Sequence, residues 1–544
     1  MEDKKIAPIG VRPPRPQGKG YGDAGASYSK KTLKGFLASS GSPHEDIDAH
    51  NYTLRQRARV LYMSAPIATS AIKTNRTNVI GCGLYLKSTI DRKYLGLSAE
   101  AAREWQRNTE QEFELWASKK NNCDMLGISN FYSAQGLLLA ASLLSGDAFV
   151  LIKRKDPTAN NPYGLRFQMV EADRISTPTA TIANGGVVFA PIGTHGKSKD
   201  GNDIFDGVEV DADGSIVAYY IRNTYPFELT TKQTDWVRVE AYGKDTGLPN
   251  VLHIMEAERP EQYRGVTYLA QVIEPLLQLR RYTDSELVAA VVESFFTAFI
   301  TSESGEGEMP LGEARSTDVP EVSTDDNEYE MGPGTVNVLK PGENVVFGDP
   351  KRPNGSFEAF VKAISKQLGA ALEIPVDLLL KEFNSSYSAS RAALLEAWKA
   401  FKMRREWFVD DFCRPIYEIW LYEAVARGRI SAPGFFSDVR TRMAWMGSEW
   451  VGPSQGQLDP VKEIQAEKMA CEEGFSTREQ STIRLNGGSY ENNAEQLRAE
   501  NEMLNPPGQV TASQAHSAEA FAAAVAKKIL PEVLNVLKQG GQDA

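Results

Sequence analysis

The stretch "FNSSYSASRAALLEAWKAFKMRR", residues 383–405, joins two unlike segments. Its first eight residues are mostly small and rich in hydroxyl groups, whereas the strong helix formers Ala, Leu, Glu and Lys dominate from Arg391 onward. The pattern predicts a polar loop from about Ile374 to Ser390, directly before a long helix over 388–426. The simplest role for such a loop is to cap the helix, with Ser388 or Ser390 as the N-cap residue.

The composition around this stretch is that of a folded chain. The chain is 42% hydrophobic and 24% charged. Its length of 544 residues is enough for roughly two to four domains. The net charge of -11 excludes a protein that grips phosphates over most of its surface, so contact with nucleic acid should be small or loose. The four cysteines and five histidines show no metal-ligand spacing, and we expect no metal, no cofactor and no disulfide.

The sequence predicts neither export nor a membrane span. Its N-terminal residues carry proline and charge but no apolar core of a signal peptide. The longest apolar runs fall short of the ~20 residues that cross a bilayer. Between residues 4 and 34, eight Lys and Arg face the single acid Asp23, which predicts a flexible basic arm.

Periodicity and turn residues predict an α+β fold. Residues 51–81 have helical spacing that is interrupted at Pro66, and a second amphipathic helix directs Trp105, Phe113 and Trp116 toward a core. A hairpin is expected at Asp213-Gly214. The predicted parts are a basic arm (1–30), an α+β part (31–268), an outgoing helix (269–300), an acidic segment (301–355), a returning helix (356–373), a loop (374–390), a long helix with its return (391–455) and a helical end (456–544).

The outgoing helix is apolar over much of its circumference. One returning helix cannot cover all of these side chains, so we expect a neighbouring subunit to contact them. The predicted contact residues are Val288, Val291, Val292, Phe295, Phe296 and Phe299. Residues 301–332 then hold ten acids and one cation, Arg315, which predicts an exposed segment.

Two motifs resemble catalytic or metal sites but lack a required residue. Gly196-Lys197-Ser198 ends like a phosphate-binding loop, yet Pro191 stands where the pattern needs glycine. Residues 209–220 open like a calcium loop, but the twelfth position is Tyr220 instead of glutamate. A tight hairpin explains the second motif better, and nothing predicts an enzyme.

Four segments taken together resemble the lambda-type bacteriophage portal proteins. The first, "ERPEQYRGVTYLAQVIEPLLQLRRYTDSELVAA", carries the family's Arg259, Pro260, Gln262, Arg264, Gly265 and Val266. The others are "GVEVDADGSIVAYYIR", "NSSYSASRAALLEAW" and "WVGPSQGQLDPVKEIQAEKMACEEGFST". They occur in the family's order over roughly residues 50–500. The third segment departs slightly from the family's residue order around Ser385–Ser390.

This resemblance implies a portal fold: an α/β wing, a long-helix stem, a small mixed α/β clip and a helical C-terminal crown. It also implies a ring of about twelve subunits at one capsid vertex, through which a separate terminase motor packages double-stranded DNA. Implied partners are the terminase large subunit, the major capsid protein and head-completion or tail connector proteins, with the chain in the virion and in the host cytoplasm during assembly. The alternatives are a DNA-packaging nuclease or ATPase, or another structural capsid or tail component.

Within that framework three sets of residues are candidates for function. The loop would touch passing DNA, and the stripe on the returning helix would face the channel unless it is only a solvated ion-pair ladder. The acidic segment would dock basic patches on motor or connector proteins. The three sets are Lys381, Asn384, Ser385, Ser386, Tyr387 and Ser388 in the loop; Glu358, Lys362 and Lys366 on the helix; and Glu321, Asp325 and Asp326 in the acidic segment.

Overall fold

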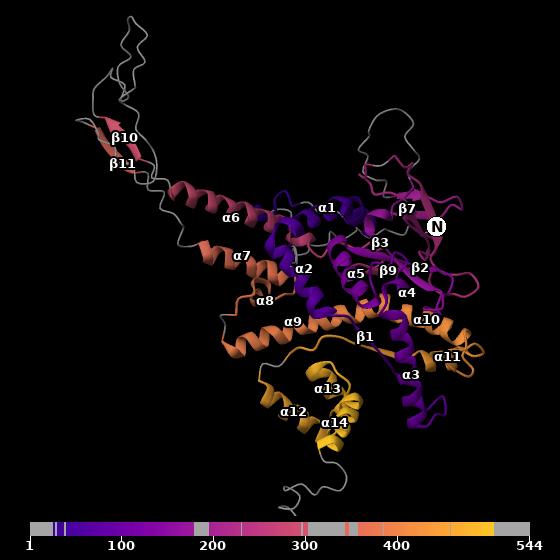
Figure 1. Ribbon diagram of the computed structural model, residues 1–544. Coiled ribbons are helices and arrows are strands. Elements are labelled where there is room, and N and C mark those ends of the chain that lie inside the picture. Colours follow the sequence, from indigo (N-terminus) through magenta and orange to yellow (C-terminus); the bar gives the residue numbers. More distant parts are fainter. Residues whose placement is uncertain are drawn as a thin grey trace, which may run out of the picture.

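The computed structural model describes ten stretches of the chain. They are residues 25–27, 30–36, 40–178, 195–229, 231–294, 298–302, 343–347, 357–383, 386–456 and 459–504. Figure 1 shows α6 (Ile273–Ser294), α7 (Phe357–Ala371) and α9 (Tyr387–Phe408) extending to one side, the sheets that contain β2 (Asp147–Arg154) and β7 (Ile216–Arg222) on the other, and the helices of residues 460–504 below.

Helices and strands occur in one mixed order along the chain. The helices are α1 (Ala49–Ser64), α2 (Pro66–Val79), α3 (Ala99–Ala117), α4 (Lys120–Cys123), α5 (Phe131–Ser145), α6 (Ile273–Ser294), α7 (Phe357–Ala371), α8 (Val376–Leu380), α9 (Tyr387–Phe408), α10 (Arg414–Ala426), α11 (Val439–Met446), α12 (Pro460–Glu472), α13 (Arg478–Asn486) and α14 (Tyr490–Leu504). The strands are β1 (Tyr85–Ser88), β2 (Asp147–Arg154), β3 (Leu165–Glu171), β4 (His195–Lys197), β5 (Asp203–Phe205), β6 (Val208–Val210), β7 (Ile216–Arg222), β8 (Trp236–Glu240), β9 (Val251–Met255), β10 (Ala298–Ser302), β11 (Glu343–Phe347) and β12 (Ser448–Val451).

All pairings between these strands are antiparallel, which makes the fold α+β as predicted. A three-stranded sheet in the order β3-β2-β9 lies beside a five-stranded sheet in the order β4 to β8. Two short pairs, β1 with β12 and β10 with β11, complete the set. The β1–β12 pair joins Tyr85 to Val451, so it ties the start of the α+β part to the residues after α11.

Local sequence signals account for most helix boundaries. Pro66 begins α2 after a break at Ala65, and Gly81 follows its end with φ 60°. Phe113 and Trp116 are buried on α3, while Trp105 packs partly buried against the same core. The expected hairpin also forms, because the Asp211 carboxylate accepts bonds from the Asp213 and Ser215 amides in its turn.

The predicted outgoing helix is too long at its C-terminal end. Helix α6 stops at Ser294, and residues 298–302 form strand β10, which pairs with β11. The physical reason is that the run "TAFITS" is rich in aromatic and β-branched residues, which favour a strand once a partner is available. That partner, "ENVVF", lies more than forty residues later in the chain.

The long helix over 388–426 forms with a local irregularity. Helices α9 and α10 are continuous through a π-helical turn at Val409–Cys413. The buried face of this continuous helix places Trp398, Phe401 and Phe412 in the main hydrophobic core. Among the described helices, none combines the length and hydropathy that a membrane crossing requires.

Candidate nucleic-acid interface

The returning helix α7 turns tightly into α8. The Ile374 amide donates to the Gly369 carbonyl (2.9 Å), and a Cβ on Gly369 would lie only 2.5 Å from the Ile374 carbonyl oxygen. Glu373 accommodates the reversal with φ 52°. The segment expected as one loop, 374–390, therefore contains the short helix α8 and the first residues of α9, which begins at Tyr387.

Helix α8 is held against α2 by packing and hydrogen bonds. Leu379 is buried, and its carbonyl accepts a bond from Ser70 Oγ (2.7 Å). The ammonium of Lys381 donates to Thr74 Oγ1 on α2 (2.8 Å), and burial lowers the pKa of Lys381. This predicted channel residue thus has its charged end directed at α2.

Three of the remaining predicted loop residues, Ser386, Tyr387 and Ser388, lie at the start of α9. The Ser390 amide donates to the Ser386 carbonyl (2.9 Å), so Ser386 is the N-cap and the alternative with Ser388 or Ser390 as N-cap is wrong. The hydroxyls of Ser386 and Ser388 are exposed and 3.5 Å apart. Tyr387 is the first helical residue, while Asn384 and Ser385 lie outside the described residues.

The predicted stripe on α7 comprises Glu358, Lys362 and Lys366. Within the described residues these three side chains form no ion pairs with one another, so they are not the ion-pair ladder that was the alternative. Lys362 Nζ pairs with Glu382 after α8 (3.2 Å), which ties α7 to the connection that leads to α9. Glu358 and Lys366 are exposed on α7. Which of these side chains faces a channel remains a prediction.

Arg404 holds the base of this region together and was missed from sequence. Its guanidinium donates to Asn75 on α2 (2.7 Å) and to Glu373 in the α7–α8 turn (3.1 Å), and it covers the ring of Tyr268 at 5.0 Å. Tyr268 in turn donates to the Leu372 carbonyl. The sequence contains one signal for this role. Arg404 lies seven residues after Ala397, so the cation falls on the buried face of the helix.

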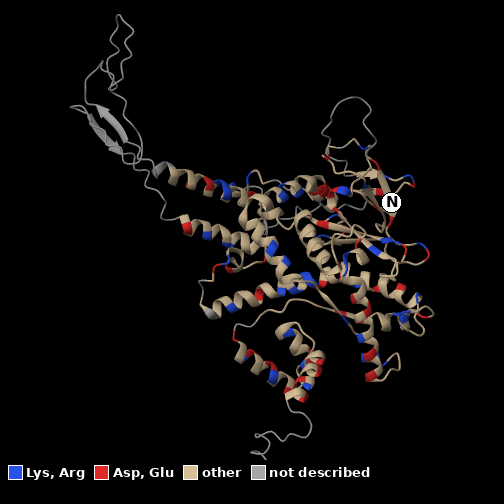
Figure 2. Cartoon of the chain, viewed as in Figure 1, with Lys and Arg blue, Asp and Glu red and all other residues tan. Residues whose placement is uncertain are grey.

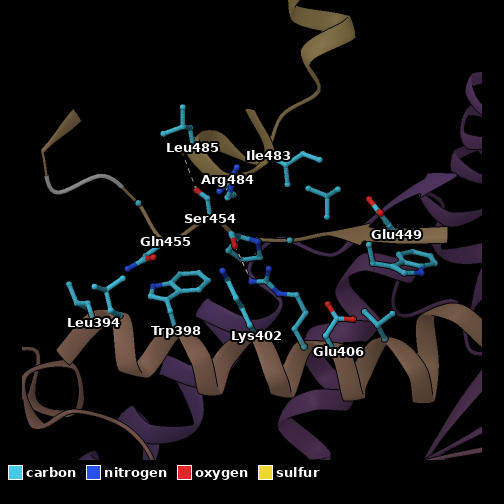
Figure 3. Close-up of a pocket in the computed structure, with 18 of the residues that line it drawn as sticks. Leu394, Trp398, Lys402, Glu406, Glu449, Ser454, Gln455, Ile483, Arg484 and Leu485 are labelled. Atoms are coloured by element: carbon cyan, nitrogen blue, oxygen red, sulfur yellow. Dashed lines mark hydrogen bonds between the residues drawn. The ribbon is translucent and has the colours of Figure 1, made fainter. Parts of the chain in front are cut away.

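Arg405 performs a similar role on the other side of α9. It donates to the carbonyls of Asn78, Val79 and Pro453 (2.8–2.9 Å), so it caps the end of α2 and holds the segment after β12. Burial lowers its pKa to about 10. Beside it, a cavity of ≈ 630 Å³ separates α9 from α12 and α13, with Trp398, Lys402 and Ile483 on its walls (Figure 3).

Comparison with known proteins adds a family to this geometry. Residues 29–405 match the family model described as "Phage portal protein, lambda family". The chain belongs to the lambda family of phage portal proteins. It is 24% identical over 521 residues to "Portal protein B" of Escherichia phage lambda, which spans 91% of this chain and 92% of the relative. It is also 24% identical to "Portal protein" of Escherichia phage N15, over 93% and 94% of the two chains.

Solved structures of gene transfer agent particles also match. A virion structure of the native particle aligns with TM-score 0.41 at 12% identity, over 80% of this chain and 93% of that one. A neck structure of the empty particle aligns with TM-score 0.42 at the same identity, over 80% and 94%.

Membership in the portal family fixes the general function. The chain is a structural portal protein of the head–tail connector at the capsid vertex, and a component of the virion. The family match therefore sets aside the alternative of a DNA-packaging nuclease or ATPase. Among the described residues, Figure 2 shows basic and acidic positions interspersed along the helices.

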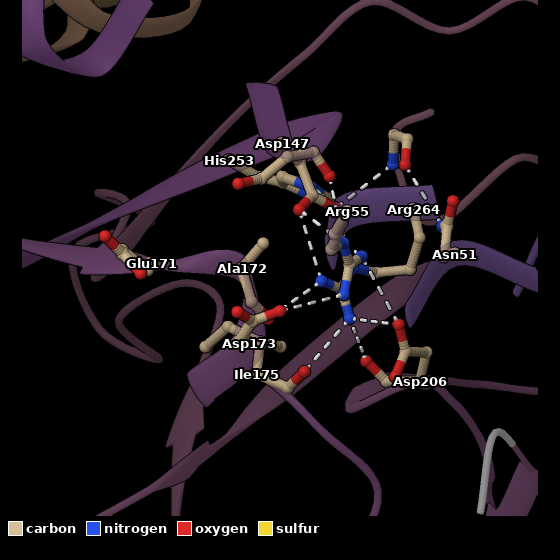
Figure 4. Close-up of polar contacts among 12 residues, drawn as sticks. Asn51, Arg55, Asp147, Glu171, Ala172, Asp173, Ile175, Asp206, His253 and Arg264 are labelled. Carbon is tan, nitrogen blue, oxygen red and sulfur yellow. Dashed lines mark hydrogen bonds and ion pairs between the residues drawn. The ribbon is translucent and has the colours of Figure 1, made fainter. Parts of the chain in front are cut away.

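In this portal protein the family-like segment that ends "YRGV" builds a buried ionic cluster (Figure 4). Arg264, 0% exposed, donates to Asp147 (Nε–Oδ2 2.6 Å) and to Asp206 (Nη1–Oδ2 2.6 Å). It also reaches the carbonyls of Ala172 and Ile175 (both 3.1 Å). One side chain thus connects β2, the β5–β6 turn and the segment after β3.

Arg55 on α1 enters the same cluster. It donates to the Ser145 carbonyl (2.9 Å) and lies 3.7 Å from Asp147. The neighbouring Asp48 is 4% exposed, and burial raises its pKa to about 7. These contacts assign the segment a role in joining the two hydrophobic cores rather than in binding DNA.

The predicted subunit contacts and the predicted acidic docking residues lie partly or wholly outside the described residues. Of the expected subunit contacts, Val288 and Val291 are exposed on α6, Val292 and Phe299 are described by backbone only, and Phe295 and Phe296 lie outside the described residues. Glu321, Asp325 and Asp326 also lie outside them.

The two motifs that lack a required residue lie in strand β4 and in the β6–β7 hairpin. Gly196 and Lys197 lie in strand β4, and Glu209 on β6 pairs with Arg238 on β8 (2.6 Å) across the intervening strand β7. Within the described stretches, no group of three or more His, Cys, Asp or Glu is placed to hold a metal ion.

Proposed function

We propose that copies of this portal protein close into a ring of about twelve subunits whose central hole passes double-stranded DNA. The observation that carries the proposal is the apolar outer face of α6. Leu287 and Val288 are 66% and 61% exposed on a helix whose opposite face is packed. Contiguous exposed apolar side chains on a folded chain indicate a protein interface.

The family architecture maps onto the described elements in a consistent way. The wing comprises residues 31–268 with the α9–α10 helix, and the stem comprises α6 and α7. The clip is built between α6 and α7, where β10 pairs with β11. The crown is the group α12–α14, which contacts the wing through exposed pairs such as Arg107 with Glu495 (2.9 Å).

Contact with DNA would come from the start of α9 and from the stem. Neutral hydroxyls at Ser386 and Ser388 offer bonds of roughly 1 kcal/mol net, which break easily as DNA moves. A ring of cations would instead add salt-dependent affinity for each phosphate it neutralises. On α7, Glu358 partly offsets Lys362 and Lys366, which keeps the stem contact weak.

Force generation belongs to a separate terminase motor in this proposal. The acidic segment with Glu321, Asp325 and Asp326 would attract basic patches on the motor or on connector proteins. The major capsid protein and the tail connector proteins are the other expected partners.

Imaging and mass measurement of the purified chain test the ring. We expect negative-stain images of annular particles with a central hole, and a native mass near twelve times the 59.9 kDa subunit. ATP turnover by the same material should be absent. A chain that stays monomeric at every concentration would contradict the proposal.

A further inference from the structure

Four side chains form a ridge along the outer face of α6. Asp284, Leu287, Val288 and Val291 follow the i, i+3, i+4, i+7 spacing that places them on one side of a helix. The Asp284 side chain is 69% exposed, and the three apolar residues are 66%, 61% and 49% exposed. The opposite side of α6 is marked by Leu279, which is 4% exposed, and by Tyr282, which packs on α7.

An apolar groove lies on a different part of the same chain. It has a volume of ≈ 540 Å³ and runs between the C-terminal half of α7, the turn into α8 and the middle of α9. Its walls include Ala370, Ile374, Pro375, Ala400 and Met403, with Lys366 at the rim. Met403 is 40% exposed although its surroundings are apolar, so this side chain lacks a full set of packing neighbours.

The ridge and the groove face opposite ways. On α7, Phe357 stacks on Tyr282 of α6 at 5.6 Å, and Leu368 on the same side is buried. Lys366 and Ala370 are roughly half a helical turn away from that side. Helix α7 therefore separates the ridge from the groove, and a single subunit cannot fill its own groove with its own ridge.

The charges beside the two surfaces are complementary. Two acids at the groove already have partners, because Glu373 pairs with Arg404 (3.1 Å) and Glu396 with Lys399 (2.7 Å). Lys366 forms no ion pair with another residue in the described part of the chain. On the ridge, Asp284 has one ion pair within the described residues, a 3.9 Å contact with Arg280.

We propose that the α6 ridge of one subunit docks in the α7–α9 groove of the next subunit, with Asp284 beside Lys366. In this arrangement Lys366 contacts the neighbouring subunit instead of DNA, so Glu358 and Lys362 are the residues of the α7 stripe left to face the channel. This inference rests on the proposed ring and names the two surfaces that build it. Because the surfaces differ, the contact is head-to-tail, and repeating it around an axis closes a ring. The apolar residues supply the burial and the charge pair fixes the register.

Cysteine cross-linking of the full-length chain tests the contact directly. In a Cys82→Ser background, which removes an exposed native thiol, Val288→Cys is combined with Ala370→Cys. Oxidation should give a ladder of multi-chain bands on a non-reducing gel, collapsing to one band on reduction. Each single variant should stay a monomer band. The matched control joins Ala370→Cys to Asp213→Cys, in the exposed hairpin turn away from both surfaces.

The outcomes separate the contact from the ring itself. If annular particles form but the double variant gives no ladder, or the control pair gives an equal one, the contact is overturned and the ring stands. If the unmodified chain forms no ring, the proposed function fails first.

Charge exchange supplies a second, independent readout. Asp284→Lys or Lys366→Asp alone should raise the concentration needed for ring formation by about two- to fivefold, and the combined exchange should restore it. If the combined variant needs a concentration as high as the two single effects predict together, the pairing is excluded. Asp213→Lys is the matched charge reversal and should leave assembly unchanged.

Discussion

Arg264 Nε lies 2.6 Å from Asp147 Oδ2, and neither side chain is exposed to solvent. A buried pair of this kind stabilises little relative to apolar packing, but breaking it leaves an uncompensated charge in the interior. The pair therefore enforces one arrangement of α1, the β3-β2-β9 sheet and the five-stranded sheet. It lies between the two hydrophobic cores and connects them.

Removing the cation should destabilise the fold strongly. Arg264→Ala leaves Asp147 and Asp206 without their main partner, and we expect the free energy of unfolding to fall by about 3–5 kcal/mol. Arg259→Ala is the matched control, because its pair with Asp46 is largely exposed and should be worth below ~1 kcal/mol. Urea unfolding followed by tryptophan fluorescence measures both variants. Equal losses would show that the cluster has no special role.

The backbone crossing next to this cluster requires glycine. A Cβ on Gly265 would lie 1.9 Å from the Gly146 carbonyl oxygen, and Gly146 itself has φ 93°. Backbone atoms cannot move aside as a flexible side chain does, so Gly265→Ala should cost about 3 kcal/mol, the upper end of the usual range for overpacking. Gly96→Ala is the control, since nothing lies within 4 Å of its added Cβ and only the strain of φ 69° remains. Melting temperature and soluble yield report the difference.

Asp48 should make stability depend on pH. Its folded pKa is raised from 3.8 to about 7 by burial, so the folded protein keeps a proton that the unfolded chain loses. This contribution is fully present below pH ~4 and is lost as pH rises toward 7. Asp411, whose pKa burial also raises to about 7, adds a slope of the same sign.

Comparison with Asp48→Asn isolates the contribution of this one carboxyl group. The free energy of unfolding of the unmodified chain should fall more between pH 5 and pH 8 than that of the variant. Parallel pH curves for the two proteins would show that Asp48 ionises normally in the folded state.

Sequence alone predicted the elements whose signals are local. Pro66 begins α2 and Gly81 follows its end, and the hairpin forms at Asp213-Gly214 between β6 and β7. Strand β10 was assigned to a helix because an apolar run of its length fits either structure, and its partner is far away in the chain. The β1–β12 pair was missed for the same reason.

The site was less accessible to sequence reasoning than the fold. A serine-rich stretch before a helix is visible, but nothing local shows that Lys381 reaches Thr74 or that Lys362 reaches Glu382. The buried roles of Arg264 and Arg404 depend on partners more than one hundred residues away, Asp147 and Asn75 among them. An arginine in a sequence is read as exposed unless its partners are known.

Adding charge at the start of α9 tests whether the portal touches DNA only lightly. Ser388 is exposed in the first turn of α9, so Ser388→Arg should fold normally and place one extra cation per subunit in the ring. Each phosphate it neutralises adds salt-dependent affinity, and we expect DNA packaging to slow at low salt and to recover as salt is raised. Ser388→Gln keeps a neutral hydrogen-bonding side chain of similar reach and should package at nearly the normal rate. The readout is the length of nuclease-protected DNA per particle over time, and equal rates for both variants at low salt would place Ser388 away from the DNA path.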